Sequence, residues 1–240
     1  MEIDAKALEI RSENVQLSSI QRLGFPLKSD GSTLHLNLKH GDISNRIISV
    51  GDTKRAMKIS KLFDKPDMCL KVYSNKTFKV YTGTYHNVPI SIVATGMGYA
   101  MMDLVVREIR QVVEGPLAII RYGTCGVINH DYRAGHIFIA SKGSTFIQSN
   151  RDLIVKKDKD KAYRIFKPAL PDPILTDLLM ENFKEIVGKD KVKGVMNCTA
   201  DSFYCSQGRP DPNYEDLNED LIDELKEKYP EAVTLEMETF

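Results

Sequence analysis

The sequence is organised around residues 119–126, which read Ile119-Ile120-Arg121-Tyr122-Gly123-Thr124-Cys125-Gly126. The preceding Pro116-Leu117-Ala118 begins an apolar run that is typical of a buried β-strand. Glycines at the end of a strand let the backbone turn sharply and approach a ligand closely. Arg121 adds a cationic fork and Thr124 a hydroxyl group, which together suit a small oxyanion such as phosphate. A tight turn with a surface arginine would explain the same residues, so the rest of the sequence has to decide.

The overall composition is that of an ordinary globular protein. The 240 residues are 42% hydrophobic and 28% charged, and 33 basic residues balance 33 acidic ones. A net charge of zero gives no reason to expect nucleic acid or a membrane surface as a partner. The apolar runs are far shorter than the roughly 20 residues of a membrane-spanning helix. The polar N-terminus does not resemble a secretory leader, so we expect a cytoplasmic protein.

The cysteines and histidines show no metal-binding pattern. Cys69, Cys125, Cys198 and Cys205 have no CxxC spacing, and the five histidines have no HExxH spacing. We therefore expect reduced thiols and no metal site.

Two further predicted strands also end in glycine. Residues 46–50 stop at Gly51-Asp52, before the helical pattern of residues 53–63, and residues 88–94 lead into Gly96-Met97-Gly98. A helix N-terminus attracts anions, and Arg55 lies in the first turn of the predicted helix. A plain strand-to-helix junction with a solvated arginine is the alternative. Neither a GxGxxG dinucleotide motif nor a GxxxxGK[ST] loop is present.

The alternation of strands with amphipathic helices predicts an α/β fold. We expect a single domain, residues 31–240, with a central mixed, mostly parallel β-sheet flanked by helices. Ligands of such sheets bind at the carboxyl ends of the strands. The polar residues 1–30 are expected to form an N-terminal extension. Residues 34–38 alternate like a short strand, whereas residues 143–163 are polar and predict an exposed loop.

A loop near the C-terminal end carries groups that suit a flat ligand. Residues 201–211 contain Phe203, Gln207 and Arg209. An amide that donates and accepts hydrogen bonds, beside a guanidinium that only donates, suits a heterocycle rich in carbonyl groups. A loop pinned by its own polar side chains is the alternative.

Two carboxylates end the sequence. Glu236 and Glu238 follow the predicted strand 232–235. At positions i and i+2 of a strand they are expected to point the same way. The polar face of an edge strand would explain them equally well.

Taken in order, these motifs resemble the uridine phosphorylase family of the nucleoside phosphorylase/hydrolase superfamily. The matching residues are Gly51-Asp52 with Arg55, Gly96-Met97-Gly98, Arg121-x-Gly-Thr-x-Gly126, Phe203-x3-Gln207-x-Arg209 and Glu236-Met237-Glu238. The Gly-Asp and Glu-Met-Glu motifs recur across the superfamily, whereas members of the family use the Gln-x-Arg loop to read uracil. The resemblance runs from about Leu34 to Phe240 and implies a nucleoside phosphorylase-like fold.

The resemblance implies a role for each matched residue. The residues that bind phosphate would be Gly51, Arg55, Arg121, Thr124 and, from a neighbouring subunit, Lys76. Those that bind uracil would be Phe203, Gln207 and Arg209. Those that bind ribose would be Glu236, Met237, Glu238 and, from a neighbouring subunit, His35. Catalysis would rest on Arg121, Thr124, Gln207 and Arg209, and Cys125 would be a packing residue.

The activity implied is the reversible cleavage of uridine by phosphate to uracil and ribose 1-phosphate, in pyrimidine salvage. Phosphate would be a co-substrate, and no cofactor is expected. Because two of the implied residues serve a neighbouring subunit, we expect a homo-oligomer that is at least a dimer.

The sequence departs from the family pattern in three places. Thr77 stands where bacterial members bind potassium through a glutamate, so no ion is expected. Lys76 replaces an arginine, which keeps the charge and loses the bidentate fork. The family continues beyond Glu-Met-Glu with a helix and a flap over the base, and we expect this segment to be missing from a chain that ends at Phe240.

Three other functions stay open. A purine nucleoside phosphorylase would use an aspartate at the purine N7, in the region of Asp201-Ser202. A hydrolytic nucleosidase would activate water and would not need Arg55 and Arg121. A non-catalytic homologue would bind nucleosides without turnover. The sequence does not decide between uridine, thymidine and deoxyuridine, or between a dimer and a hexamer.

Overall fold

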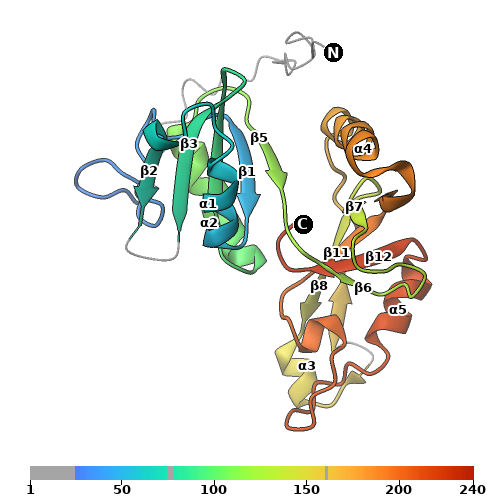
Figure 1. Cartoon of the computed structure of the whole chain (residues 1–240). Helices are drawn as coiled ribbons and strands as arrows, with labels where there is room; N and C mark the ends of the chain where they lie inside the picture. The colour runs from blue at the N-terminus through green and yellow to red at the C-terminus, as the bar shows by residue number, and fades with distance from the viewer. Residues whose placement is uncertain (1–24, 75–77, 160–161) are drawn as a thin grey trace. The chain divides into compact units, whose positions relative to one another are not determined.

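The computed structural model of the chain describes residues 25–74, 78–159 and 162–240. The chain divides into two compact units, which Figure 1 shows in its colours from blue to red. The first unit comprises Met1–Gly96 and Met101–Gly123, and the second comprises Met97–Ala100 and Thr124–Phe240. The chain therefore passes between the units in both glycine-rich motifs, at residues 96–101 and between Gly123 and Thr124.

The first unit is built on a five-stranded sheet with the strand order β2-β3-β4-β1-β5. The strands are β1 (Arg46–Val50), β2 (Leu70–Tyr73), β3 (Lys79–Tyr85), β4 (Val88–Ala94) and β5 (Ala118–Arg121). β4, β1 and β5 are parallel, so their carboxyl ends lie at one edge of the sheet. β2, β3 and β4 are antiparallel. β3 and β4 form a hairpin, and its turn residues His86 and Asn87 have φ of 49° and 62°.

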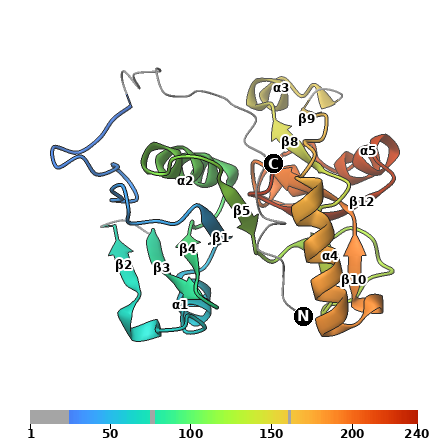
Figure 2. The ribbon, with the colours of Figure 1, turned by 90° about the horizontal axis from the view of Figure 1, so that it is seen from above.

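Two helices cover opposite faces of this sheet, as Figure 2 shows. α1 (Thr53–Ser60) begins at Asp52, whose carboxylate accepts a hydrogen bond from the Lys54 N–H at 2.9 Å. α2 (Tyr99–Val112) contributes Val105 and Ile109 to one buried apolar cluster, whereas α1 contributes Ala56 to another. A short 3-10 helix, η2 (Pro66–Met68), precedes β2.

The second unit contains a five-stranded sheet, in the order β6-β12-β11-β8-β9, and a two-stranded sheet of β10 and β7. The strands are β6 (Gly126–Val127), β7 (Ile137–Ile139), β8 (Ser144–Ser149), β9 (Tyr163–Ile165), β10 (Val192–Gly194), β11 (Met196–Ala200) and β12 (Ala232–Glu236). The central strands β12, β11 and β8 are parallel, and the edge strands β6 and β9 are antiparallel to their neighbours.

The helices of the second unit are α3 (Arg151–Val155), α4 (Pro173–Val187) and α5 (Leu221–Lys228), with 3-10 turns η4 (Lys189–Lys191) and η5 (Cys205–Gln207). α5 packs on the five-stranded sheet through Leu221 and Leu225, which share a buried cluster with Ile147 and Leu235. α4 contacts β7 and β10.

The α/β class with mixed sheets flanked by helices is confirmed. The strands are distributed over three sheets, whereas the sequence indicated one central sheet. One reason is that residues 192–200 form two strands, β10 and β11, which are separated at Val195 and join different sheets. The assignment of residues 31–240 to one domain stays a prediction. The expected extension over residues 1–30 lies mostly outside the described residues.

The exposed loop expected over residues 143–163 is wrong in its first half. Residues 144–149 form β8, whose residues Ser144 to Ile147 are buried in the sheet. The polar side chains there are paired: Ser144 Oγ lies 3.2 Å from Thr199 Oγ1, and Thr145 Oγ1 donates to the Phe166 carbonyl at 2.6 Å. Because the hydroxyl groups find partners inside the protein, a polar segment can be a central strand.

The short strand expected over residues 34–38 is a turn. The N–H groups of His35 and Leu36 donate to the Glu108 carboxylate of α2 at 2.9 and 2.8 Å, and not to a neighbouring strand. Asn37 has φ of 61°, a left-handed conformation that no strand accommodates. The alternating pattern instead reflects Leu36 and Leu38, which are fully buried.

Candidate active site

The carboxyl ends of β1, β4 and β5 bring together the residues that we call the anion group, namely Gly51, Arg55, Thr95 and Arg121. Arg121 ends β5, and its Nη1 donates to the Oγ1 of Thr95, directly after β4, at 3.3 Å. Gly51 directly follows β1, and a Cβ atom there would lie only 3.2 Å from Arg121 Nη2. The absence of a side chain at Gly51 therefore lets the Arg121 guanidinium lie against the strand end.

Arg55 brings a second guanidinium group to the same edge of the sheet. It lies in the first turn of α1, which contains no acidic residue. Its Nη1 lies 3.5 Å from the carbonyl oxygen of Tyr122, and its guanidinium lies 5.9 Å from the Tyr122 ring centroid. Tyr122 directly follows Arg121, so both cations are close to one short backbone segment. Two guanidinium groups near a helix N-terminus favour a bound oxyanion.

The phosphate-binding roles of the other two predicted residues, Thr124 and Lys76, stay predictions. Thr124 is exposed and belongs to the second unit. Lys76, and Thr77 beside it, lie outside the described residues.

The predicted uracil residues come together in the second unit, in the segment 203–209 that we call the base loop. Gln207 is only 6% exposed, and its Oε1 accepts a hydrogen bond from Arg209 Nη2 at 3.2 Å. Arg209 Nε donates to the Phe203 carbonyl at 3.0 Å, and its guanidinium lies 4.3 Å from the Phe203 ring centroid. The loop thus presents an aromatic ring, an amide and a guanidinium at one place.

Asp201 anchors the start of this loop to β8. Its Oδ2 accepts hydrogen bonds from the N–H and the Oγ of Ser149, both at 3.0 Å. Its Oδ1 accepts a hydrogen bond from Ser206 Oγ. Both carboxylate oxygens are therefore engaged within the protein.

Only the first of the two carboxylates at the end of the chain lies in a strand, so the strand geometry from which a common direction was expected does not extend to Glu238. β12 ends at Glu236, whose Oε1 accepts hydrogen bonds from Asn197 Nδ2 at 2.8 Å and Thr199 Oγ1 at 2.5 Å. Its Oε2 accepts the N–H of Glu238 at 2.8 Å, which turns the chain out of the strand direction. Glu238 is 8% exposed and accepts the N–H of Gly98 at 2.7 Å. Met237, between them, is half-buried.

Two cysteines close to Glu236 stay protonated at neutral pH. Desolvation and then the negative charge of Glu236 raise the pKa of the Cys125 thiol, and the same two causes raise that of Cys198 to about 12. Because the thiolate is the reactive form, neither cysteine is suited to be a nucleophile.

His35 is held by a buried carboxylate of α2. Its Nδ1 lies 2.6 Å from Glu108 Oε1, and its side chain is 31% exposed. Burial raises the pKa of Glu108, but hydrogen bonds from the Leu36 N–H, from His35 and from the Thr33 side chain together lower it by more, so it lies below its usual range. With Nδ1 facing Glu108, the other ring nitrogen, Nε2, is the one left for a ligand.

Three residues that the sequence interpretation did not single out contact the predicted ones. They are Thr95, which binds Arg121, Glu108, which binds His35, and Asn218, which donates to two carbonyl groups of the base loop. Glu108 could have been identified from the sequence, because it is a carboxylate on the apolar face of an amphipathic helix. Asn218 lies in an irregular polar segment, where no periodicity marks it.

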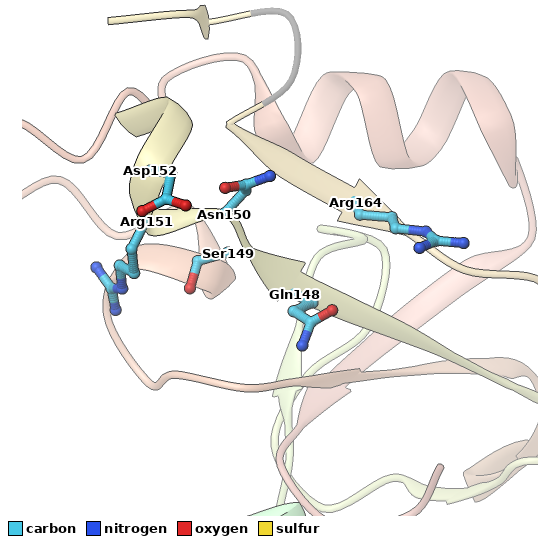
Figure 3. A pocket seen from close by; sticks show the side chains of 6 residues that line it. All are labelled: Gln148, Ser149, Asn150, Arg151, Asp152 and Arg164. Atoms are coloured by element: carbon cyan, nitrogen blue, oxygen red, sulfur yellow. The ribbon is translucent and has the colours of Figure 1, made fainter. Parts of the chain in front are cut away.

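A separate pocket in the second unit has a volume of about 360 Å³ and is lined by Gln148, Ser149, Asn150, Arg151, Asp152 and Arg164. Figure 3 shows the guanidinium groups of Arg151 and Arg164 at opposite sides of it, pointing away from one another. Arg164 lies over the Phe166 ring at 4.3 Å, and Arg151 donates to Cys205 Sγ at 3.3 Å. The pocket contains none of the predicted site residues, and we assign it no ligand.

The described parts of the chain offer no other obvious site. Within them, no group of three or more His, Cys, Asp or Glu side chains is arranged to hold a metal ion. No helix in the same ranges has the length and apolar character needed to cross a membrane.

Known proteins resemble both the sequence and the fold. A family model described as "Phosphorylase superfamily" matches residues 45–240. A uridine phosphorylase of Thermococcus kodakarensis is 28% identical over 204 residues, which cover 84% of this chain and 68% of that protein. A DeoD-type purine nucleoside phosphorylase of Geobacillus kaustophilus is 33% identical over 130 residues, which cover 54% of this chain and 53% of that protein.

A solved structure gives a closer match. It comes from a study of two diverse uridine phosphorylases in the oomycete Phytophthora capsici, and it has a TM-score of 0.86 and 37% identity to this chain. The match covers 91% of this chain and 80% of the solved one.

Proposed function

The chain belongs to the Phosphorylase superfamily, and from this premise we propose that it is a uridine phosphorylase. It cleaves the N-glycosidic bond of uridine with phosphate and releases uracil and ribose 1-phosphate, a reversible reaction of pyrimidine salvage. The uridine phosphorylases of Thermococcus kodakarensis and Phytophthora capsici support this substrate. Because the chain spans 68% and 53% of the lengths of the two curated relatives, the activity has to be tested on this chain itself.

The observation that carries the proposal is the pairing of Gln207 with Arg209. Uracil offers two carbonyl acceptors and one N–H donor along one edge. The Gln207 amide supplies donors and, because its Oε1 has two lone pairs, one further acceptor beside the bond from Arg209. The Arg209 guanidinium supplies only donors. This set matches the uracil edge, with the half-exposed Phe203 ring beside it.

The same residues explain how the reaction is accelerated. Cleavage of the N-glycosidic bond builds positive charge on the ribose and negative charge on the departing uracil. Gln207 and Arg209 stabilise that negative charge, and preorganised donors of this kind are each worth about 3–4 kcal/mol. The cations Arg55 and Arg121, with Gly51 and Thr124, hold the phosphate that attacks the anomeric carbon with inversion. Most of the rate comes from positioning and electrostatics, with no covalent intermediate.

The ribose is bound by Glu236, Met237 and Glu238. Glu238 is assigned to the 2′- and 3′-hydroxyl groups, which would replace or share its hydrogen bond from Gly98. Glu236 contributes to ribose binding mainly because it stabilises the turn that leads to Glu238.

A purine nucleoside phosphorylase is the second candidate, because the Geobacillus kaustophilus relative carries that name. Such an enzyme would need Asp201 at the purine N7. Both oxygens of Asp201 are already engaged with Ser149 and Ser206, which favours the pyrimidine.

One assay separates the candidates. Cleavage of uridine, thymidine and inosine is measured with and without phosphate, and we expect phosphate-dependent cleavage of uridine. Faster cleavage of inosine would identify a purine enzyme, and cleavage without phosphate a nucleosidase. Binding of uridine without turnover would identify a non-catalytic homologue. Dialysis against a chelator should leave the activity unchanged, because we propose that no metal or cofactor takes part.

We place the enzyme in the cytoplasm as a homo-oligomer that is at least a dimer. Four free cysteines in the described residues agree with a reducing compartment. His35 and Lys76 are assigned to the site of a neighbouring subunit, where His35 Nε2 reaches the ribose 5′-hydroxyl. Sedimentation of the active enzyme tests this assignment, because a fully active monomer would contradict both roles.

A further inference from the structure

The base loop is closed by one buried amide. Asn218 lies between the loop and α5 and is 5% exposed. Its Nδ2 donates to the carbonyl oxygens of Cys205 at 2.9 Å and of Arg209 at 3.1 Å. These carbonyls lie on either side of Gln207, so the two hydrogen bonds of one side chain join the ends of residues 205–209, which carry Gln207 and Arg209.

The backbone inside this closure has an unusual conformation. Gly208, between Gln207 and Arg209, has φ of 63°, and a Cβ atom there would lie 2.7 Å from Ile222 Cγ1. Glycine has the largest conformational freedom of all residues, so a glycine at the centre of a loop does not by itself hold one geometry. The relative placement of Gln207 and Arg209 therefore depends on hydrogen bonds, both within the loop and from Asn218 outside it.

The segment that carries Asn218 is itself fixed. The hydroxyl group of Tyr163 donates to the Asp216 carbonyl at 2.7 Å, and burial raises the pKa of Tyr163, which keeps the hydroxyl protonated. Leu217 has φ of 54°, a left-handed conformation that leucine rarely adopts. Such conformations persist where the surroundings determine them, and they often occur at functional sites. A strained residue directly before Asn218 indicates that the surrounding structure fixes the direction of the Asn218 side-chain amide.

We infer that Asn218 is a positioning residue for base recognition. It holds Gln207 and Arg209 in the arrangement that reads a pyrimidine base before the base arrives. This rests on the proposed function, which assigns base recognition to those two side chains. The hydrogen bonds of Asn218 include no residue of the anion group, so its loss should weaken the binding of uridine and not that of phosphate.

The first test is the Asn218→Asp variant. It keeps the size of the side chain but places a carboxylate oxygen against two carbonyl oxygens. We expect the KM for uridine to rise about tenfold or more and the KM for phosphate to change by less than about twofold, as for the loss of a buried hydrogen-bond donor. The matched control is Asn182→Asp on α4, which also loses an amide donor to a backbone carbonyl, that of Leu178 at 2.7 Å. Both KM values should stay unchanged in the control.

The second test does not depend on activity. The N–H groups of Gly208 and Arg209 donate to the carbonyls of Cys205 and Tyr204 at 3.2 and 3.1 Å, so their hydrogen exchange reports on the loop. In the unliganded Asn218→Asp variant their exchange should become about tenfold faster, whereas that of the anion group should not change. Asn218→Ser, which keeps one donor, should have a smaller effect and replaces the first variant if that one does not fold.

The outcomes are distinguishable. If the wild-type chain does not cleave uridine, the proposed function fails, and the exchange measurement alone decides whether Asn218 holds the loop. A folded Asn218→Asp variant with unchanged KM for uridine and unchanged exchange would overturn the inference. An equal rise of both KM values, or failure of both variants to fold, would overturn it too, because either result makes Asn218 a residue of general stability.

Discussion

The anion group of the first unit and the base loop of the second hold their functional side chains by different means. In the anion group, Arg121 ends a parallel strand that is paired in register with β1, and the N–H of the next residue, Tyr122, donates to the Ser49 carbonyl at 2.8 Å. In the base loop, Gln207 ends the short 3-10 turn η5 and Arg209 lies in the irregular backbone after it, and side chains such as Asn218 and Asp201 hold this segment in place.

This difference determines where each region is vulnerable. A sheet edge keeps its geometry when one side chain changes, so the anion group depends mainly on its positive charges. An irregular loop depends on a few hydrogen bonds, so its recognition depends on geometry as much as on charge. The following substitutions test this contrast, in order of decreasing effect.

Removal of the Arg121 guanidinium should have the largest effect. In Arg121→Ala we expect kcat/KM for phosphate to fall about 100- to 1000-fold, as when one preorganised charged donor is lost, with little change in uridine binding. Steady-state kinetics with each substrate varied in turn, together with calorimetry of uridine binding, measures how the loss divides between phosphate and uridine. Arg46→Ala, at the amino end of the neighbouring strand β1, is the control and should leave kcat/KM for both substrates nearly unchanged. Equal losses for both substrates would contradict the separation of the two regions.

Removal of the Arg209 guanidinium should have the opposite selectivity. In Arg209→Ala we expect kcat/KM for uridine to fall about 100-fold, while the KM for phosphate stays within about twofold. Arg209→Lys restores the charge without the planar fork, so it should recover only part of the activity. If Arg209→Ala retained full activity, the assignment of the base loop to uracil would be wrong.

Loss of the Glu108 carboxylate should destabilise the first unit in a pH-dependent way. The pKa of Glu108 is lowered from its ordinary value of 4.5, so its contribution to stability is present above about pH 4.5 and is lost as the pH falls through its folded-state pKa. Glu108→Gln should cost about 1–3 kcal/mol at pH 7, as for a broken buried charged hydrogen-bond pair. Urea unfolding of both proteins should show this difference shrinking on acidification.

An exposed carboxylate on the same helix provides the control for Glu108. Asp103 is 53% exposed and pairs with Arg107 at 2.8 Å, and Asp103→Asn should change stability by less than about 1 kcal/mol. A Glu108→Gln effect that does not depend on pH would mean that packing, and not the ionised carboxylate, is responsible.

The smallest effect separates backbone strain from crowding in the base loop. Gly208→Ala and Gly115→Ala both place a side chain at positive φ, 63° and 71°, which costs about 1–2 kcal/mol. Of the two, Gly208 has a neighbour in the way, Ile222, whereas nothing lies within 4 Å of a Cβ atom at Gly115. Thermal unfolding should therefore show the larger loss for Gly208→Ala, and only that variant should raise the KM for uridine. Equal effects would mean that the loop tolerates displacement.

The regular parts of the fold were predictable because they carry local signals. Apolar runs that end in glycine predicted the strands β1, β4 and β5, and an Asp before an amphipathic pattern predicted the start of α1. The parallel edge where these strands end also brought Gly51, Arg55 and Arg121 together, as the pattern indicated. Burial along a strand or helix follows from the periodicity of its own residues.

Elements without such signals were mispredicted. β8 is rich in hydroxyl side chains and was expected to be a loop, because polarity indicates exposure unless partners are known. The turn at residues 34–38 was expected to be a strand, because leucines alternate with polar residues in this turn as they do in a half-buried strand. In each case a distant side chain or carbonyl satisfies the polar groups, and that partner is invisible in the local pattern.

The sequence by itself determined which chemical groups the protein carries and in what order: the glycine-rich strand ends, the arginines, the Gln-x-Arg loop and the family that they resemble. The tertiary structure alone decided which of these groups touch, and through which residues. Glu108 binds His35 across 73 positions, and Asn218 binds the carbonyl of Cys205, 13 positions before it in the base loop. The physical reason is that periodicity records local burial, whereas the partner of a buried polar group is chosen by the packing of the whole chain.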